Sequence, residues 1–250
     1  MKWPYARLWA LLATAFAVIM LLSTFDDLRI FGHQMAKVKT SPEVGGQAVR
    51  SVAVSEKNVA ATDTCKYTLL FVGDSMLEGL SPRLAAYAEE NGHSLYTVIW
   101  YGSTTEKWGA THKLRAYIEK FKPGYIVVCL GGNELFLRNV ERSRAAMVDS
   151  IIADIGGLPF VWIGPPNWKR DTGIKPLNAG KVGNVHFFLS SNLSLDRASD
   201  GAHPTREAAA VWMDSVAVWI STKSVCPMRL DVPHKRSAKP VKTIVLTPDD

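Results

Sequence analysis

YTLLFVGDSM, residues Tyr67 to Met76, is the stretch from which the architecture of this chain can be inferred. It begins with mostly apolar, β-favouring residues and ends in the turn Gly73-Asp74-Ser75. Such a run is typical of a strand that is buried on both faces of a parallel sheet. Ligands of open parallel sheets bind beyond the carboxyl ends of the strands. The Ser75 hydroxyl is therefore predicted to lie at the functional edge of a sheet.

Further runs of the same kind alternate with segments of helical periodicity. We predict strands at 95–100, 125–130 and 160–164, with a less regular fifth at 185–189. Between and after them, apolar residues at helical spacing predict helices at 82–91, 114–121, 148–155 and 205–221. This alternation predicts a parallel sheet with helices on both faces.

Polar motifs follow the predicted strands. Gly102 comes after the second strand, Asn133 after the third, and the segment Asp200-Gly-Ala-His203 precedes the last helix. Taken singly, each motif is an ordinary turn or cap. Together they supply what acyl transfer from Ser75 needs: His203 as the base and Asp200 to hold its tautomer. The Ser75 and Gly102 backbone N–H groups and the Asn133 amide are predicted oxyanion donors.

These four blocks, in this order, resemble the SGNH or GDSL-type hydrolases, which are named for a serine, a glycine, an asparagine and a histidine. The matching residues are Ser75 in Gly-Asp-Ser, Gly102, Asn133 in Gly-Gly-Asn and His203 in Asp-x-x-His. The resemblance implies a flavodoxin-like three-layer α/β/α domain. It also implies serine esterase, lipase or carbohydrate acyl-transfer activity without a metal or cofactor.

Two positions depart from the family pattern. Met76 follows the serine where leucine is usual, and Glu134 follows the asparagine where aspartate is common. Neither position is expected to perform the chemistry. The absence of Gly-x-Ser-x-Gly argues against an ordinary α/β-hydrolase. No spacing of histidines or cysteines resembles a metal site.

The N-terminus predicts export. Residues 8–25 carry no charge and would span roughly 27 Å as a helix. Lys2 and Arg7 precede this segment, and Asp26 and Asp27 follow it. The charge asymmetry predicts a single-pass anchor in a bacterial inner membrane, with the rest of the chain in the periplasm. A cleaved signal peptide is the alternative.

Composition bounds the remaining organisation. A chain of 250 residues with 47% hydrophobic and 21% charged residues can bury one core. The net charge of +6 is scattered, with no long basic block between aromatics, so nucleic acid is not an expected partner. We predict a cytoplasmic N-terminus at residues 1–7, an anchor at 8–25 and a flexible stalk at 26–64. A hydrolase domain at 65–226 and a disordered basic, proline-containing tail at 227–250 follow.

The cysteines and tryptophans yield further expectations. Cys65 precedes the first strand and Cys226 follows the last helix, so both should lie at the sheet end opposite the site. A disulfide between them is predicted for an oxidising compartment. Trp108 and Trp168 lie in loops after strands and are predicted to line the mouth of the site, where they could stack on sugar rings. Packed loop aromatics are the alternative reading.

The functional expectation is a serine esterase that removes acyl groups, O-acetyl above all, from cell-envelope or extracellular carbohydrate. Two alternatives stay open. A polysaccharide O-acetyltransferase would use the same triad with a sugar hydroxyl in place of water. A catalytically silent, membrane-tethered binding or scaffold protein would keep only the fold.

Overall fold

The computed structural model describes Thr14, residues 29–30 and 33–34, and residues 65–250. The strands β1 (Arg29–Ile30) and β2 (His33–Gln34) form a short antiparallel pair. They belong to a first compact unit, whereas residues 65–250 belong to a second, which is described from here on.

The predicted anchor, residues 8–25, lies outside the described residues except for Thr14. The predicted stalk, residues 26–64, also lies outside them apart from the β1–β2 pair. In the described parts of the chain, no helix has the length and apolar character needed to span a membrane.

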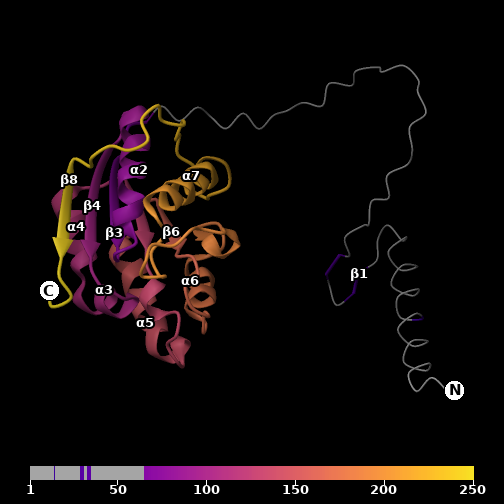
Figure 1. Ribbon diagram of the computed structural model, residues 1–250. Helices are drawn as coiled ribbons and strands as arrows, with labels where there is room; N and C mark the ends of the chain where they lie inside the picture. The colour runs from indigo at the N-terminus through magenta and orange to yellow at the C-terminus, as the bar shows by residue number, and fades with distance from the viewer. Residues whose placement is uncertain (1–13, 15–28, 31–32, 35–64) are drawn as a thin grey trace, which may run out of the picture. The chain divides into compact units, whose positions relative to one another are not determined.

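A six-stranded parallel sheet forms the centre of the second unit, in the order β7-β6-β5-β3-β4-β8 (Figure 1). Without the last strand, the order is the flavodoxin-like 2-1-3-4-5. The predicted parallel α/β architecture is thus confirmed. The strands are β3 (Thr68–Gly73), β4 (Ser94–Trp100), β5 (Tyr125–Cys129), β6 (Phe160–Gly164), β7 (Phe187–Leu189) and β8 (Lys242–Leu246).

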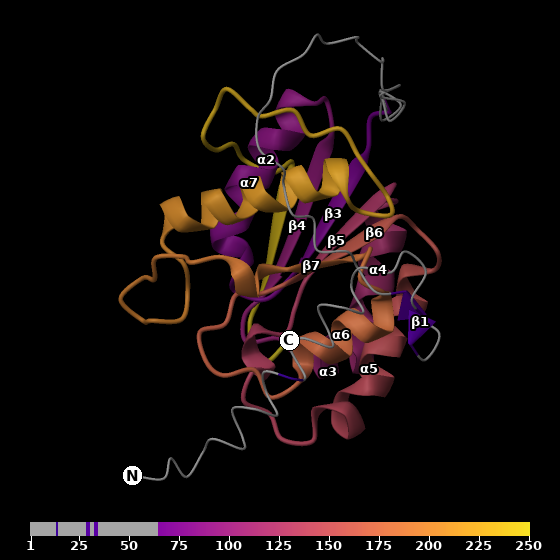
Figure 2. The same ribbon diagram turned by 90° about the vertical axis from the view of Figure 1, so that its right-hand side faces the viewer.

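Helices cover both faces of this sheet, as Figure 2 shows. The helices α2 (Leu77–Glu90) and α7 (Arg206–Thr222) pack together on one face. The other face carries α3 (Thr105–Thr111), α4 (Lys113–Phe121), α5 (Val140–Ile155) and α6 (Ile174–Val182). Two 3-10 turns, η1 (Gly132–Glu134) and η2 (Ser190–Asn192), follow β5 and β7. Alternate residues of β3 enter the two cores: Leu69 and Phe71 one, Leu70 and Val72 the other.

The start of α2 differs from the sequence-based expectation. The helix begins at Leu77, directly after the serine turn, and Pro82 lies inside it. Because proline is favoured in the first helical turn, Pro82 was expected near the start. The helices α3 and α6 have only 7 and 9 residues and were not predicted.

The prediction of disorder for residues 227–250 is wrong. Met228 and Leu230 are buried, with 1% and 7% of their surface exposed. The segment ends in β8, which pairs in parallel with the edge strand β4. Prolines interrupt regular structure here, but they do not prevent side chains from packing against a neighbouring core. The folded unit therefore extends beyond Cys226, and we call residues 227–250 the C-terminal segment.

The predicted disulfide between Cys65 and Cys226 is not formed in the described structure, where Cys226 is a half-buried free thiol. The Tyr125 hydroxyl donates a 2.8 Å hydrogen bond to the Cys226 carbonyl at the start of β5. Cys226 thus lies at the amino-terminal end of the sheet. Sequence position indicates the end of a sheet, but not the few ångströms that decide whether two sulfurs can bond. Cys129 is fully buried, and burial raises the pKa of its thiol.

Candidate active site

The turn that carries Ser75 joins β3 directly to α2. The Leu77 N–H donates to the Asp74 carbonyl at 3.2 Å, and the Glu78 N–H to the Ser75 carbonyl at 3.1 Å. A Cβ at Gly73 would lie 2.2 Å from the Cys129 carbonyl oxygen. Only glycine therefore lets β3 leave the sheet so close to β5.

Ser75 contacts a histidine that is distant in the sequence. Its Oγ lies 2.7 Å from Nε2 of His203, and the two residues are 128 positions apart in the sequence. The His203 Nδ1 lies 2.7 Å from Oδ2 of Asp200. The three residues predicted to form a triad are thus in hydrogen-bonding contact. This is the geometry of a nucleophile, a base and a group that orients the base.

Asp200 is exposed, and hydrogen bonds stabilise its negative charge further. Its Oδ1 accepts hydrogen bonds from the backbone N–H groups of His203 at 2.9 Å and Ala202 at 2.8 Å. These bonds and the imidazole lower the pKa of Asp200 to about 2, with the His203 backbone N–H as the largest cause. A carboxylate on Nδ1 favours the tautomer whose Nε2 is free to accept the serine proton.

Contacts with Arg197 and Ala198 also hold the loop around His203. Arg197 and Pro204 form an antiparallel bridge, and the Ala198 N–H donates to the His203 carbonyl at 2.8 Å. The Arg197 Nη1 donates to the Ala202 carbonyl at 2.6 Å. Sequence reasoning missed Arg197, because a single arginine in a loop carries no pattern. The imidazole is therefore positioned by backbone contacts on both sides.

Two of the predicted oxyanion donors, Gly102 and Asn133, follow the two strands that flank β3. Gly73 is in register with Ile99 of β4 and with Cys129 of β5, so the three following loops begin side by side. The Asn133 Nδ2 donates to the Ser103 carbonyl at 2.9 Å, which ties η1 to the loop of Gly102. Gly102 is exposed and has a φ of 63°, a conformation that favours glycine.

Glu134 holds η1 and the loop of Gly102 together through its buried carboxylate. It is 2% exposed, and its carboxylate accepts the Thr105 N–H at 2.9 Å and the Thr105 hydroxyl at 2.8 Å. Arg144 donates to it from α5 at 2.7 Å. Glu134 thus connects η1 to the first residue of α3. Sequence reasoning did not assign it a role, because its partners are far from it in the chain.

Asp74, beside the candidate nucleophile, is buried and only half satisfied. Its Oδ1 accepts the Met76 N–H at 3.0 Å, whereas its Oδ2 has no hydrogen-bond partner among the described residues. Burial raises the pKa of Asp74 to about 7. A protonated side chain at this position avoids an unpaired buried charge.

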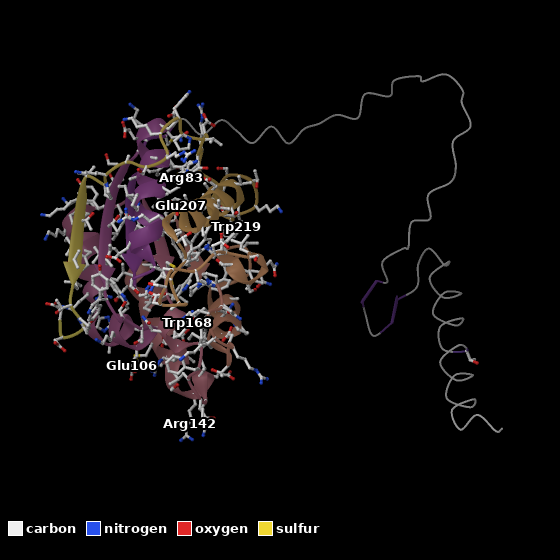
Figure 3. All side chains as sticks on the ribbon, viewed as in Figure 1. Arg83, Glu106, Arg142, Trp168, Glu207 and Trp219 are labelled. Carbon is white, nitrogen blue, oxygen red and sulfur yellow. The ribbon has the colours of Figure 1, made fainter. Side chains whose placement is uncertain are left out.

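Neither of the two predicted aromatic residues lines the cavity beside Ser75. Trp108 is fully buried and donates to the Ser103 hydroxyl at 3.0 Å, so the prediction that it lines the mouth is wrong. It lies in α3 and packs into the core on the sheet face that carries α3 to α6. Trp168, labelled in Figure 3, stays half-exposed. Its Nε1 donates to the Gly132 carbonyl at 2.9 Å, next to Asn133.

A cavity of about 480 Å³ opens beside Ser75 and His203. It extends between the start of α2, the start of α7 and the edge of the sheet formed by β4 and β8. Within the described residues, no cluster of three or more histidine, cysteine, aspartate or glutamate side chains is arranged to hold a metal ion.

No family model and no curated protein matches the chain. Solved structures similar to it include the esterase EstA from Pseudoalteromonas, with 21% identity and a TM-score of 0.43, covering 60% of this chain and 93% of that one. A lipase/acylhydrolase from Enterococcus faecalis has 19% identity and a TM-score of 0.47, with coverage of 60% and 93%. A family 3 carbohydrate esterase from Clostridium thermocellum has 18% identity and a TM-score of 0.47, with coverage of 64% and 100%.

Proposed function

We propose that the protein is a serine ester hydrolase that removes O-acetyl groups from carbohydrate. The observation that carries the proposal is the unbroken chain from Ser75 Oγ through His203 to Asp200, with both contacts at 2.7 Å. It lies at the carboxyl edge of a parallel sheet and beside a cavity. A serine hydroxyl in this setting can form an acyl-enzyme.

In the first half-reaction, Ser75 Oγ attacks the ester carbonyl carbon while His203 Nε2 takes its proton. The carbonyl oxygen becomes an oxyanion, for which the Ser75 and Gly102 N–H groups and the Asn133 amide are the proposed donors. Asp200 stabilises the imidazolium. The intermediate then expels the sugar alkoxide, which takes the proton from His203 Nε2, and an acetyl-enzyme remains.

In the second half-reaction, His203 Nε2 removes a proton from water as the water attacks the acetyl-enzyme carbonyl. The tetrahedral intermediate collapses, Ser75 Oγ leaves with the proton from His203, and acetic acid is released. The carbohydrate part of the proposal is supported by the cavity of about 480 Å³ beside Ser75 and His203, which has room for a sugar unit.

The test measures acetate release from p-nitrophenyl acetate and from an acetylated oligosaccharide by the purified full-length chain. Ser75→Ala should lower the rate by at least about 10³-fold. Ser143→Ala, which removes an exposed hydroxyl in α5, should retain the wild-type rate. Equal rates for wild type and Ser75→Ala would reject the proposal. A sugar hydroxyl acceptor that takes up the acetyl group faster than water does would identify an acetyltransferase instead.

We further propose that residues 8–25 anchor the protein in a bacterial inner membrane with the catalytic domain in the periplasm. The charges that flank this segment support the proposal. Protease added to spheroplasts should digest the domain and leave cytoplasmic markers intact. Protection of the domain from protease would contradict this orientation.

A further inference from the structure

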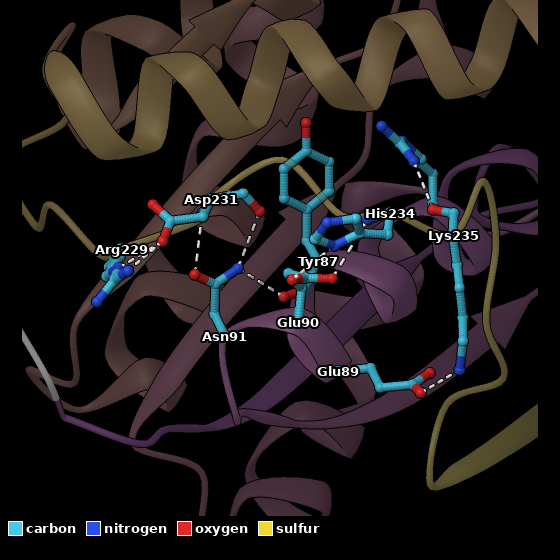
Figure 4. Close-up of polar contacts among 9 residues, drawn as sticks. Tyr87, Glu89, Glu90, Asn91, Arg229, Asp231, His234 and Lys235 are labelled. Atoms are coloured by element: carbon cyan, nitrogen blue, oxygen red, sulfur yellow. Dashed lines mark hydrogen bonds and ion pairs between the residues drawn. The ribbon is translucent and has the colours of Figure 1, made fainter.

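The C-terminal segment is attached along α2 by specific contacts, which Figure 4 shows. At its start, the Asp231 N–H donates to Asn91 Oδ1 at 2.9 Å, and Asn91 Nδ2 donates to the Asp231 carbonyl at 3.0 Å. His234 Nδ1 then lies 3.0 Å from Glu90, the last residue of the helix. The segment thus follows a defined path over α2.

Further contacts continue this path toward the sheet. The buried Arg83 donates to Asp214 of α7 at 2.6 Å and to the Lys235 carbonyl at 2.9 Å. The Ala238 N–H donates to the Pro82 carbonyl at 2.9 Å. Figures 1 and 2 show the chain passing over α2 before it enters β8. These bonds fix where the last strand reaches the edge of the sheet.

The two faces of β8 have different surroundings. Ile244 and Leu246 pack into the core beneath the sheet. Thr243 and Val245 point to the opposite face because side chains alternate along a strand. Both line the cavity that also contains Ser75 and His203. Val245 is 54% exposed, so no helix of residues 65–250 covers it.

The position of the cavity indicates which part of an ester it would hold. Its lining includes His203, whereas the proposed oxyanion donors Gly102 and Asn133 do not line it. A general acid must reach the leaving oxygen, so the alcohol part of the ester lies on the side of His203. A volume of about 480 Å³ falls within the usual range of ligand pockets, about 300–1,000 Å³, and far exceeds an acetyl group.

We infer that this cavity binds the alcohol part of the substrate, a sugar unit, and that Pro240, Thr243 and Val245 of the C-terminal segment form the wall that selects it. The inference rests on the proposed esterase function of Ser75. Polar groups for sugar hydroxyls are present on other walls, where Glu78 accepts a hydrogen bond from the Tyr101 hydroxyl and Arg206 is exposed. The C-terminal segment would then determine specificity without contributing to the triad.

The first test compares two acetate esters with different alcohols, glucose pentaacetate and ethyl acetate, with acetate release followed by titration. Val245→Trp places a large side chain in the cavity. It should lower the ratio of kcat/KM for the sugar ester to that for ethyl acetate at least tenfold. Val241→Trp is the matched control, because Val241 directly precedes β8 and is 62% exposed but does not line the cavity. An unchanged ratio in Val245→Trp would overturn the inference.

The second test does not require turnover. Ser75→Ala and the double variant Ser75→Ala/Val245→Trp are titrated with glucose pentaacetate by calorimetry. Binding should be at least fivefold weaker in the double variant. Equal binding by the two proteins, or no binding by either, would overturn the inference. If wild type and Ser75→Ala released acetate equally, the proposed esterase function itself would fail, while this binding comparison would still test the cavity.

Discussion

Asp200 in the His203 loop and Asp74 in the Ser75 turn belong to one site but have opposite electrostatics. Asp200 is exposed and accepts three hydrogen bonds, and its pKa is lowered to about 2. Asp74 is buried with one oxygen unpaired, and burial raises its pKa to about 7. Burial and the hydrogen bonds that a carboxylate receives together decide whether it stays charged and can serve as the partner of the histidine.

The largest expected effect on activity comes from removing the charge of the exposed Asp200. Asp200→Asn should lower kcat by about 10³- to 10⁴-fold, because an amide oxygen no longer stabilises the imidazolium and the ring tautomer can invert. Steady-state kinetics with p-nitrophenyl acetate measure this effect. Asp196→Asn, an exposed aspartate of the same loop, is the control and should stay within twofold of wild type. A similar loss in both variants would mean that the triad assignment is wrong.

The buried aspartate should appear in the pH dependence of stability. Folding raises the pKa of Asp74 from 3.8 to about 7, so between these values the folded protein holds a proton that the unfolded chain has released. The free energy of unfolding should therefore fall as pH rises from about 4 to 7 and level off above.

Asp74→Asn removes this titration. Its stability relative to wild type should rise by on the order of 2–4 kcal/mol between pH 5 and pH 8, as measured by urea unfolding. Asp196→Asn should keep the wild-type pH dependence. If Asp74→Asn and wild type lost stability in parallel over this range, the Asp74 carboxyl would not be the group responsible.

A buried carboxylate that is fully paired sharpens the contrast. Glu134→Gln leaves Arg144, whose side chain is 11% exposed, without the partner it has in η1. We expect the free energy of unfolding to fall by about 2 kcal/mol and kcat to fall about tenfold, because the turn of Asn133 loosens. Chemical unfolding and kinetics measure the two effects. Glu141→Gln, exposed on α5, should change neither stability nor kcat. Wild-type stability and kcat in Glu134→Gln would show that Glu134 does not hold the turn of Asn133.

The smallest effect is expected at the end of the His203 loop. The Thr205 Oγ1 caps α7 by accepting the Ala208 N–H at 3.1 Å. Thr205→Ala should lower the free energy of unfolding by about 1 kcal/mol. Thr222→Ala, at the exposed C-terminal end of the same helix, provides the comparison. Equal changes in both variants would show that the cap has no special role.

The sheet and the placement of Ser75 and Asn133 at its carboxyl edge could be predicted because their signals are local. A strand such as β3 is an apolar run that ends in a turn, and Ser75 and Asn133 directly follow such runs. Parallel pairing then places those ends at one edge. The sequence pattern alone thus brought the residues of the candidate site together, without any information about distances.

Other features depend on contacts between distant residues and could not be predicted. Trp108 is buried because α3, a helix too short to show periodicity, turns it inward. Glu134 has its role through Thr105 and Arg144. The prolines and charges of the C-terminal segment favour a prediction of disorder. A local sequence pattern does not reveal that the edge of β4 is available to pair with β8.

The activation of Ser75 by His203 is tested by reaction with a fluorophosphonate followed by peptide mass mapping. We expect one adduct, on Ser75, formed at least 10²-fold more slowly in His203→Ala. No adduct on Ser75, or labelling at the same rate in wild type and His203→Ala, would contradict it.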